Sequence, residues 1–213
     1  MVRASRILAA YSKSVFINCP FDDTFKPLFH AIVYTIYDMG FLPKCAKDKS
    51  NAGQTRIDKI YDLIDQCKYS VHDISRTEPD AINNLPRFNM PLELGLDLGC
   101  KNFGQLHHKE KVILILDTEP YRFQKYISDI AGQDIDAHAN DVAIVIEVVR
   151  NWLRREVNYK KFKTPSGKEI YRRYQDFEAA LPTICTRMAW DIKSLPFIDF
   201  SAAAAEWIQN NPI

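Results

Sequence analysis

Three short segments of the chain combine carboxylates with residues that form loops or open helices. They are residues 18–23 (Asn-Cys-Pro-Phe-Asp-Asp), residues 73–76 (Asp-Ile-Ser-Arg) and residues 89–93 (Asn-Met-Pro-Leu-Glu). A carboxylate can hold a ligand hydroxyl, or it can act on a reacting carbon as a nucleophile. Glu93 is the leading candidate for chemistry, because it is one of few polar residues in an otherwise apolar helical opening. Asp97, four residues on, is expected to share its helix face.

The same residues also have ordinary structural explanations. A glutamate in the first turn of a helix interacts favourably with the helix dipole by a few tenths to ~1 kcal/mol, and this accounts for Glu93 taken alone. Asp73 is explained as a turn residue that ends a strand. Phe21 is explained as a core residue, and Arg87 as a surface charge. The function therefore depends on whether the fold brings the three segments together.

The elements that must position these residues alternate along the first two-thirds of the chain. The alternation predicts an α/β fold with an open, mainly parallel sheet flanked by helices, of the flavodoxin or Rossmann type. Apolar spacing predicts strands at residues 14–18, 41–46, 69–73 and 111–117, with helices at residues 24–39, along the stripe 57–64, and from residue 90. Asn89 is predicted to cap the third helix, because Pro91 is tolerated in a first helical turn.

A helical extension is predicted to follow this α/β part. The pattern first indicates a helical piece at residues 121–128, a short strand at 134–135 and a helix at 142–156. The composition changes at Asn158, and helices are expected at about 168–190 and from 201. Pro182 is predicted to end, kink or restart the first of these. We therefore expect an α/β domain over residues 1–157 and a C-terminal helical extension over residues 158–213.

The predicted sheet places the three segments at one edge. Ligands of open α/β sheets bind outside the carboxyl ends of the strands. Residues 18–23 and 73–76 follow the first and third predicted strands, and residues 89–93 open the next helix. This edge is the predicted binding site.

Composition excludes several other classes of protein. The 213 residues carry 28 Lys and Arg against 27 Asp and Glu, so no strong field draws the chain to nucleic acid or to an anionic membrane. The apolar run at residues 112–116 is far shorter than the roughly 20 residues that cross a bilayer, and no signal peptide is evident. Neither GxGxxG nor a Walker loop occurs. We expect a cytoplasmic protein that contacts neither membrane nor nucleic acid.

Cysteines and histidines give no metal-binding pattern. No CxxC pair or zinc-like Cys/His spacing is present, so we expect reduced thiols and no metal site. Cys45 and Cys67 lie in apolar surroundings and are predicted to be core residues. His107 and His108 stand beside lysines and are predicted to form a solvated turn.

The order of the three segments resembles that in the nucleoside 2-deoxyribosyltransferase and TIR-like superfamily, over roughly residues 14–155. In the deoxyribosyltransferases a Gly-Pro-Phe loop follows the first strand, an Asp follows the third strand, and Glu-x-Gly opens the next helix. Cys19-Pro20-Phe21, Asp73 and Glu93-Leu94-Gly95 stand in those places. Enzymatic TIR domains also carry a glutamate on this helix. Cys19 replaces the glycine, and Asn89-Met90-Pro91 replaces the usual small residues before the glutamate.

The resemblance implies cleavage or transfer at an N-glycosidic bond, with NAD or a related nucleotide as substrate and no further cofactor. Such reactions pass through an oxocarbenium-like transition state, which Glu93 as the catalytic carboxylate would stabilise or trap. Nicotinamide leaves NAD as a neutral molecule, so the lack of an obvious catalytic histidine favours NAD over an ordinary nucleoside. The resemblance also implies a homo-oligomer and, for bacterial TIR-like effectors, a role in antiphage defence.

The remaining predicted roles concern substrate binding. Phe21 is expected to pack on a base or nicotinamide, Asp22 and Asp73 to hold ribose hydroxyls, and Arg56 or Arg87 to meet phosphate. The full set of predicted substrate-binding residues is Asn18, Pro20, Phe21, Asp22, Arg56, Asp73, Ser75, Arg87, Asn89 and Met90.

Three alternatives to this function remain open from the sequence. The first is a nucleoside or nucleotide 2-deoxyribosyltransferase, and the second is a module that binds a nucleotide or assembles without catalysis. A flavodoxin-like regulator is a weaker third, because Asp22, Asp73 and Lys111 only loosely resemble an acidic pocket.

Overall fold

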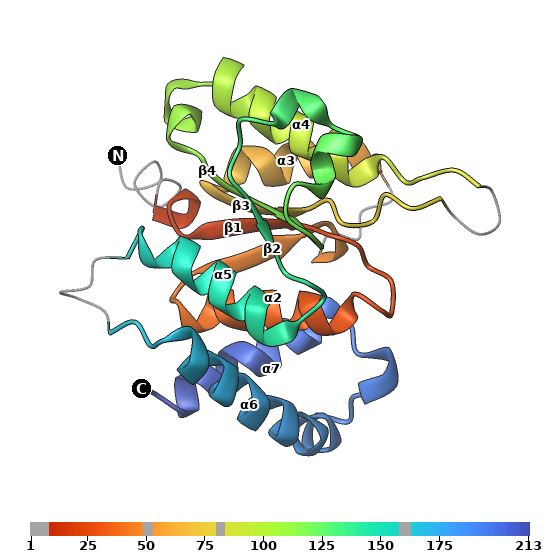
Figure 1. Cartoon of the computed structure of the whole chain (residues 1–213). Coiled ribbons are helices and arrows are strands. Elements are labelled where there is room, and N and C mark those ends of the chain that lie inside the picture. The colour runs from red at the N-terminus through yellow and green to blue at the C-terminus, as the bar shows by residue number, and fades with distance from the viewer. Residues whose placement is uncertain (1–8, 49–52, 80–83, 158–162) are drawn as a thin grey trace. The chain divides into compact units, whose positions relative to one another are not determined.

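The chain folds around a five-stranded parallel sheet, shown in Figure 1. The structure is a computed structural model that describes residues 9–48, 53–79, 84–157 and 163–213. The strand order is β2-β1-β3-β4-β5, and every neighbouring pair is parallel. The strands are β1 (Ser14–Asn18), β2 (Leu42–Cys45), β3 (Tyr69–Asp73), β4 (Val112–Asp117) and β5 (Ile135–Ala137). The predicted α/β class and open parallel sheet are confirmed.

Besides helical residues 9–11 before the first strand, six α-helices lie between or after the strands in the described part of the chain. They are α2 (Lys26–Asp38), α3 (Arg56–Gln66), α4 (Asn89–Phe103), α5 (Val142–Arg154), α6 (Gly167–Met188) and α7 (Phe197–Asn210). Short 3-10 turns occur at Ala46–Asp48, Leu106–Glu110, Arg122–Lys125, Ser128–Ile130 and Ile192–Ser194. No helix in the described part of the chain is long and apolar enough to span a membrane.

The chain divides into two compact units. The first comprises residues 1–25 and 42–140, with all five strands, α3 and α4. The second comprises residues 26–41 and 141–213, with α2, α5, α6 and α7. The sequence instead predicts a boundary after residue 157, next to Asn158, which lies outside the described residues.

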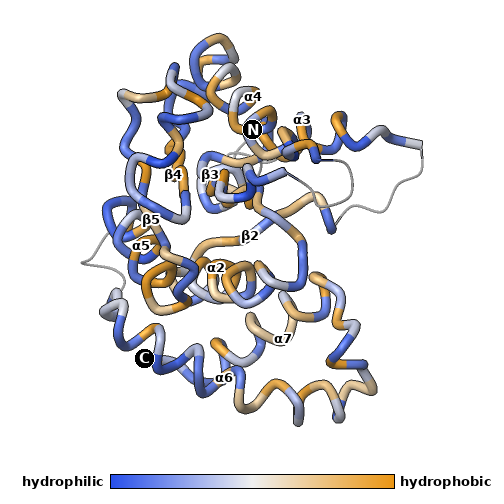
Figure 2. Tube along the Cα trace, turned by 45° about the vertical axis from the view of Figure 1, so that its right-hand side comes forward, coloured by the Kyte–Doolittle hydropathy of each residue, from blue (hydrophilic) through white to orange (hydrophobic). Residues whose placement is uncertain are grey.

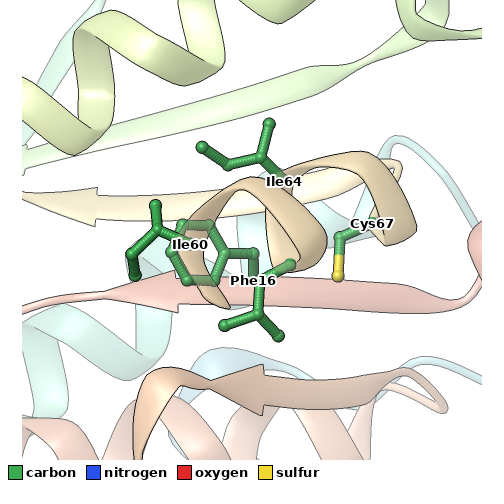
Figure 3. Packing of buried hydrophobic residues seen from close by; sticks show 5 residues of the cluster. Phe16, Ile60, Ile64 and Cys67 are labelled. Carbon is green, nitrogen blue, oxygen red and sulfur yellow. The ribbon is translucent and has the colours of Figure 1, made fainter. Parts of the chain in front are cut away.

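In the first unit α3 and α4 lie side by side against the sheet. The α3 stripe of Ile60, Leu63 and Ile64 packs on Phe16 of β1 and on Cys67 (Figure 3). Thr55 caps α3: its side chain accepts the Asp58 amide while the Asp58 carboxylate accepts the Thr55 amide. The cap and the stripe together explain why this segment is helical and which face it buries.

The central strands lie in the interior of the protein. Every residue of β1 and β3 is buried, and Figure 2 shows the apolar run of β4. A second cluster joins Ile74, Leu94, Ile115 and Phe123. Cys45 and Cys67 are fully buried, as predicted. All five cysteines lie within the described residues, and none forms a disulfide.

The second unit is a helical assembly with an aromatic centre. Tyr34 of α2 stacks on Phe177 of α6 with ring centroids 5.3 Å apart, and Phe177 meets Phe200 of α7 edge to face. Asp38 of α2 accepts a 2.8 Å hydrogen bond from Arg173 of α6, and both side chains are buried. A buried ion pair therefore joins α2 to a helix more than a hundred residues later in the chain.

Several predicted element limits are wrong. The final helix begins at Phe197 instead of residue 201, because Pro196 in an extended conformation stands at its N-cap. The helix predicted at about 168–190 is α6, and of the three effects predicted for Pro182 only the end of the helix is excluded, because α6 continues to Met188. The predicted helical piece at residues 121–128 is two short 3-10 turns, and the predicted strand at 134–135 lies at Ile135–Ala137.

Candidate functional site

A cavity of about 710 Å³ opens at the carboxyl ends of β1 and β3. The chain leaves β1 toward β2 on one side and later returns to β3 on the other, so this is the switch point where open parallel sheets bind ligands. The lining residues come from the loops after β1 and β3 and from the first turns of α3 and α4. They are Cys19, Pro20, Phe21, Asp22, Arg56, Arg76, Glu78, Arg87, Asn89 and Met90.

Glu93 lies one helical turn after the cavity-lining Asn89. Helix α4 begins at Asn89, its N-cap is Phe88, and no side chain caps it. The predicted cap by Asn89 is therefore wrong, and Glu93 lies in the second turn instead of the first. The helix-dipole explanation of Glu93 loses force, because that interaction fades beyond the first turn. Glu93 and Asp97 are both buried, which confirms that they share a face.

Burial and Arg56 have opposite effects on the pKa of Glu93. The residue is 4% exposed, and burial raises the pKa of its carboxyl above the ordinary value. Arg56 Nη2 lies 3.4 Å from Glu93 Oε1 and opposes that rise. Since Arg56 also lines the cavity, the pair links the buried carboxylate to the open space.

The cavity wall carries both guanidinium groups and carboxylates. Arg76 Nη2 lies 3.3 Å from Asp22 Oδ1 and donates to Thr24 Oγ1 at 2.5 Å. Burial acts to raise the pKa of Asp22, but hydrogen bonds from Thr24, the Phe25 amide and Arg76 outweigh it and lower that pKa. Lys47 Nζ lies 4.6 Å from the centre of the Phe21 ring. Together with Arg56 and Arg87, Arg76 gives the cavity three guanidinium groups suited to an anionic ligand.

Cys19 lines the cavity without offering a nucleophile. Its side chain is fully buried, and burial raises the pKa of the thiol well above its ordinary value. The nearby Asp73 carboxylate raises that pKa further. At neutral pH the group is therefore a thiol and not the reactive thiolate.

Asp73 and Ser75 are buried beneath the cavity and are hydrogen-bonded to each other. Asp73 Oδ1 accepts hydrogen bonds from the Ser75 amide at 3.0 Å and from Ser75 Oγ at 2.5 Å. His138 Nε2 lies 3.0 Å from Asp73 Oδ2, and His138 Nδ1 accepts the Asn140 amide. Both residues shape the end of β3, and neither lines the cavity.

The loop after β3 is fixed by Arg122. This side chain donates to Asp117 Oδ1 from Nε at 2.8 Å and from Nη2 at 2.6 Å. It also donates to the Ser75 carbonyl and, through Nη1, to Thr77 Oγ1 at 2.9 Å and Glu78 Oε1 at 3.0 Å. The strand end of β4 thereby holds the loop that carries Arg76 and Glu78 into the cavity.

The structure brings seven of the predicted substrate-binding residues to the cavity wall. These are Pro20, Phe21, Asp22, Arg56, Arg87, Asn89 and Met90. Asn18, Asp73 and Ser75 lie buried behind the wall.

Sequence reasoning placed Arg76 in the segment 73–76 at this edge but gave it no role, and it missed Glu78 on the wall and His72 and His138 behind it. The one signal available was that Arg76 and Glu78 follow the predicted third strand. His138 follows a weak three-residue strand, and nothing in its local sequence marks it.

Among the described residues, one group has the geometry of a metal site: Asp65, His107 and His108 at the opposite, amino edge of the sheet. His108 is buried, so its predicted solvated environment is wrong. Its Nδ1 accepts the Gln105 amide at 3.1 Å, which leaves the proton of a neutral ring on Nε2, facing Asp65. A metal needs that nitrogen's lone pair, so the hydrogen bonding disfavours His108 as a ligand.

Comparison with protein-family models finds no match to this chain. Comparisons with curated proteins and with solved structures find none either.

Proposed function

We propose that the chain cleaves or transfers the N-ribosyl bond of NAD or a related nucleotide, with Glu93 as the catalytic carboxylate. The observation that carries the proposal is a buried glutamate joined through Arg56 to an arginine-lined cavity at the switch point of the sheet. A volume of about 710 Å³ accommodates a nucleotide-sized ligand. The resemblance in the sequence supports the same assignment.

The proposed reaction requires little from the protein besides a carboxylate and tight binding of the substrate. As the C–N bond breaks, positive charge develops on the ribosyl carbon, and an ionised Glu93 would stabilise that charge or trap the cation covalently. Water or a second acceptor then takes the ribosyl group, and the electron pair of the broken bond leaves with the base. Nicotinamide departs as a neutral molecule and needs no proton.

The buried histidines favour such a leaving group. His72 and His138 are fully buried, and neither lines the cavity. Neither ring offers a proton to a departing base. This favours nicotinamide over a nucleobase that must be protonated as it leaves.

The cavity wall supplies roles for the other residues. Arg56, Arg76 and Arg87 would bind phosphate oxygens, and Phe21 would pack on a base or on the nicotinamide ring. Asp73 is fully buried and does not line the cavity, so ribose hydroxyls are assigned to Asp22. In this proposal Asp73 shapes the site from behind.

The test measures nicotinamide release from NAD by the purified full chain. Glu93→Gln keeps the size of the side chain and removes its charge, and we expect about a 10²-fold or greater loss of kcat, as when one electrostatic stabiliser of a transition state is removed. Glu119→Gln is the matched control, since Glu119 is exposed on the loop after β4. Equal rates for wild type and Glu93→Gln would remove Glu93 from the mechanism.

Other outcomes identify the alternative functions. Base exchange on deoxynucleosides without NAD consumption would indicate a 2-deoxyribosyltransferase. Thermal stabilisation by a nucleotide without any product would indicate a sensing or assembly module. The proposal also includes a cytoplasmic location, a homo-oligomeric active state and a role in antiphage defence, and turnover that rises with protein concentration would support the oligomer.

A further inference from the structure

A chain of buried polar side chains runs behind the cavity, from Lys111 at the amino end of β4 to Asn18 at the carboxyl end of β1. Lys111 Nζ lies 3.1 Å from Asp97 Oδ1, and Asp97 Oδ2 lies 2.9 Å from His72 Nε2. His72 Nδ1 lies 2.9 Å from Asn18 Nδ2. All four residues are at most 2% exposed. In such a buried chain each donor must be paired with an acceptor, because an unpaired polar group is costly in a low-dielectric interior.

The direction of every hydrogen bond in this chain can be assigned. Asn18 Nδ2 also lies 3.1 Å from the Met90 carbonyl, which can only accept, so the nitrogen side of the amide faces Met90 and His72. His72 Nδ1 must then accept from Asn18, and its Nε2–H donates to Asp97. Burial acts to raise the pKa of Asp97, but the His72 hydrogen bond and the Lys111 charge outweigh it and keep that pKa low.

This arrangement leaves the oxygen of the Asn18 side chain without a donor. Asn18 Oδ1 is buried and has no hydrogen-bond partner among the residues that the structure describes. Asn18 precedes the cavity-lining Cys19 and is bonded to the cavity-lining Met90. A buried acceptor without a partner is unfavourable, and a ligand that donates to it removes the penalty.

We propose that His72 is a positioning residue that fixes the Asn18 amide so that Oδ1 receives an N–H or O–H hydrogen of the ligand beside Glu93. Asp97 and Lys111 hold His72 in the tautomer that this requires. The inference rests on the proposed function, because it assigns a contact to that same site. On NAD the donor is the carboxamide N–H of the nicotinamide ring or a ribose hydroxyl.

The first test needs no ligand. In the ¹⁵N-labelled full chain, the Asn18 side-chain nitrogen should show a scalar coupling to His72 Nδ1 across the N–H···N hydrogen bond. Long-range proton–nitrogen spectra should show His72 protonated at Nε2 and bare at Nδ1. A protonated Nδ1, or no coupling, would mean that the amide faces the other way and would overturn the inference.

The second test separates positioning from structural support. His72→Phe fills the same space without polar atoms, whereas His72→Asn restores an acceptor for the Asn18 amide. We expect His72→Phe to raise the KM for NAD by about tenfold, the equivalent of one neutral hydrogen bond, with little change in kcat. His72→Asn should recover part of that KM. His107→Phe, at the opposite edge of the sheet, is the control and should leave both constants unchanged.

A substrate comparison identifies the donor. Nicotinic acid adenine dinucleotide carries a carboxylate in place of the carboxamide and so lacks its N–H. If Asn18 accepts from the carboxamide, wild type should prefer NAD and His72→Phe should lose that preference. If it accepts from a ribose hydroxyl, His72→Phe should raise the KM of both dinucleotides equally.

The outcomes distinguish this inference from the proposed function. If NAD is not cleaved, or Glu93→Gln is fully active, the proposed function fails, and the coupling alone then decides whether His72 orients Asn18. If NAD is cleaved but His72→Phe leaves the KM unchanged, His72 has only a structural role and the inference is wrong.

Discussion

At the scale of single residues, Arg56 is expected to set the pH range in which Glu93 is ionised. Burial raises the pKa of Glu93, and the Arg56 guanidinium 3.4 Å away lowers it. We predict that Arg56→Met raises this pKa further, so the acidic limb of the pH–rate profile of kcat shifts to higher pH. The profile, together with the ¹³C shift of the Glu93 carboxyl, measures the change.

Two variants control the Arg56 experiment. Arg56→Lys keeps the charge and should shift the limb less than Arg56→Met does. Lys59→Met removes a charge from the same helix without touching Glu93 and should leave the limb in place. If the acidic limb of the pH–rate profile shifts equally in Lys59→Met, the shift is due to the net charge of α3 and not to the Arg56–Glu93 pair.

Glu93 should also lower the stability of the folded chain. Its raised pKa means that the folded protein binds a proton more tightly than the unfolded chain does, so stability is lost as the pH rises above the unfolded value near 4.5. We predict that Glu93→Gln increases the free energy of unfolding at neutral pH by about 1 kcal/mol, as substitutions that relieve a functional site often do. Urea unfolding at several pH values measures the gain, which should vanish in acid. A constant gain at all pH values would contradict the linkage.

At the scale of elements, the junction between β4 and the loop after β3 depends on Arg122. The guanidinium satisfies a fully buried Asp117 and also the Ser75 carbonyl. We predict that Arg122→Met destabilises the chain by about 2 kcal/mol, because it leaves a buried carboxylate with fewer donors. Chemical denaturation measures the loss.

A matched exposed arginine serves as the comparison for Arg122. Arg172 on α6 pairs with Glu169 and Asp176, and all three side chains are exposed. Arg172→Met should leave the free energy of unfolding nearly unchanged, since solvent screens such pairs. Equal losses in the two variants would show that burial of Asp117 does not decide the effect.

Elements were predictable where a periodic pattern met a clear end signal. The stripe 57–64 and the run 111–117 satisfy a simple rule, that apolar residues face a core, and both lie in the predicted elements. Asn89 shows where such prediction fails. It is a good capping residue, but it is the first residue of the helix, and the N-cap is Phe88. The end of a helix is set by tertiary contacts as well as by local preference.

The sequence predicted the edge of the sheet at which the candidate site lies, but it did not predict the hydrogen bonds among the buried residues behind it. Residues that follow strands could be assigned to the cavity side because all strands are parallel. His72 could not be assigned a role, because its partners Asn18 and Asp97 lie 54 and 25 residues away in the chain. A buried histidine in a strand has the same local pattern whether it supports a core or orients a ligand-binding group.

At the scale of the whole molecule, helix α2 belongs to the same compact unit as the helices that end the chain. The α2 segment interrupts the first unit between β1 and β2, yet its aromatic and charged residues contact α6 and α7. Phe29 meets Phe197 with ring centroids 5.4 Å apart, and Asp38 pairs with Arg173. The C-terminal helices are therefore part of the core around α2.

This dependence predicts the result of cutting the chain at residue 157. The fragment 1–157 loses Arg173 and both C-terminal helices, so Asp38 is left without its partner and the apolar face of α2 without its cover. Burial already raises the pKa of Asp38, and removing one partner of a buried pair destabilises by about 3–5 kcal/mol, before the lost apolar contacts are counted. We expect the fragment to bind a hydrophobic dye and to show poor dispersion of its amide proton signals.

Within the full chain, Arg173→Met should lower stability far more than Arg187→Met, whose pair with Glu206 is exposed. A fragment 1–157 with sharp, dispersed spectra and cooperative unfolding would instead establish it as an independent domain, as the sequence pattern predicts.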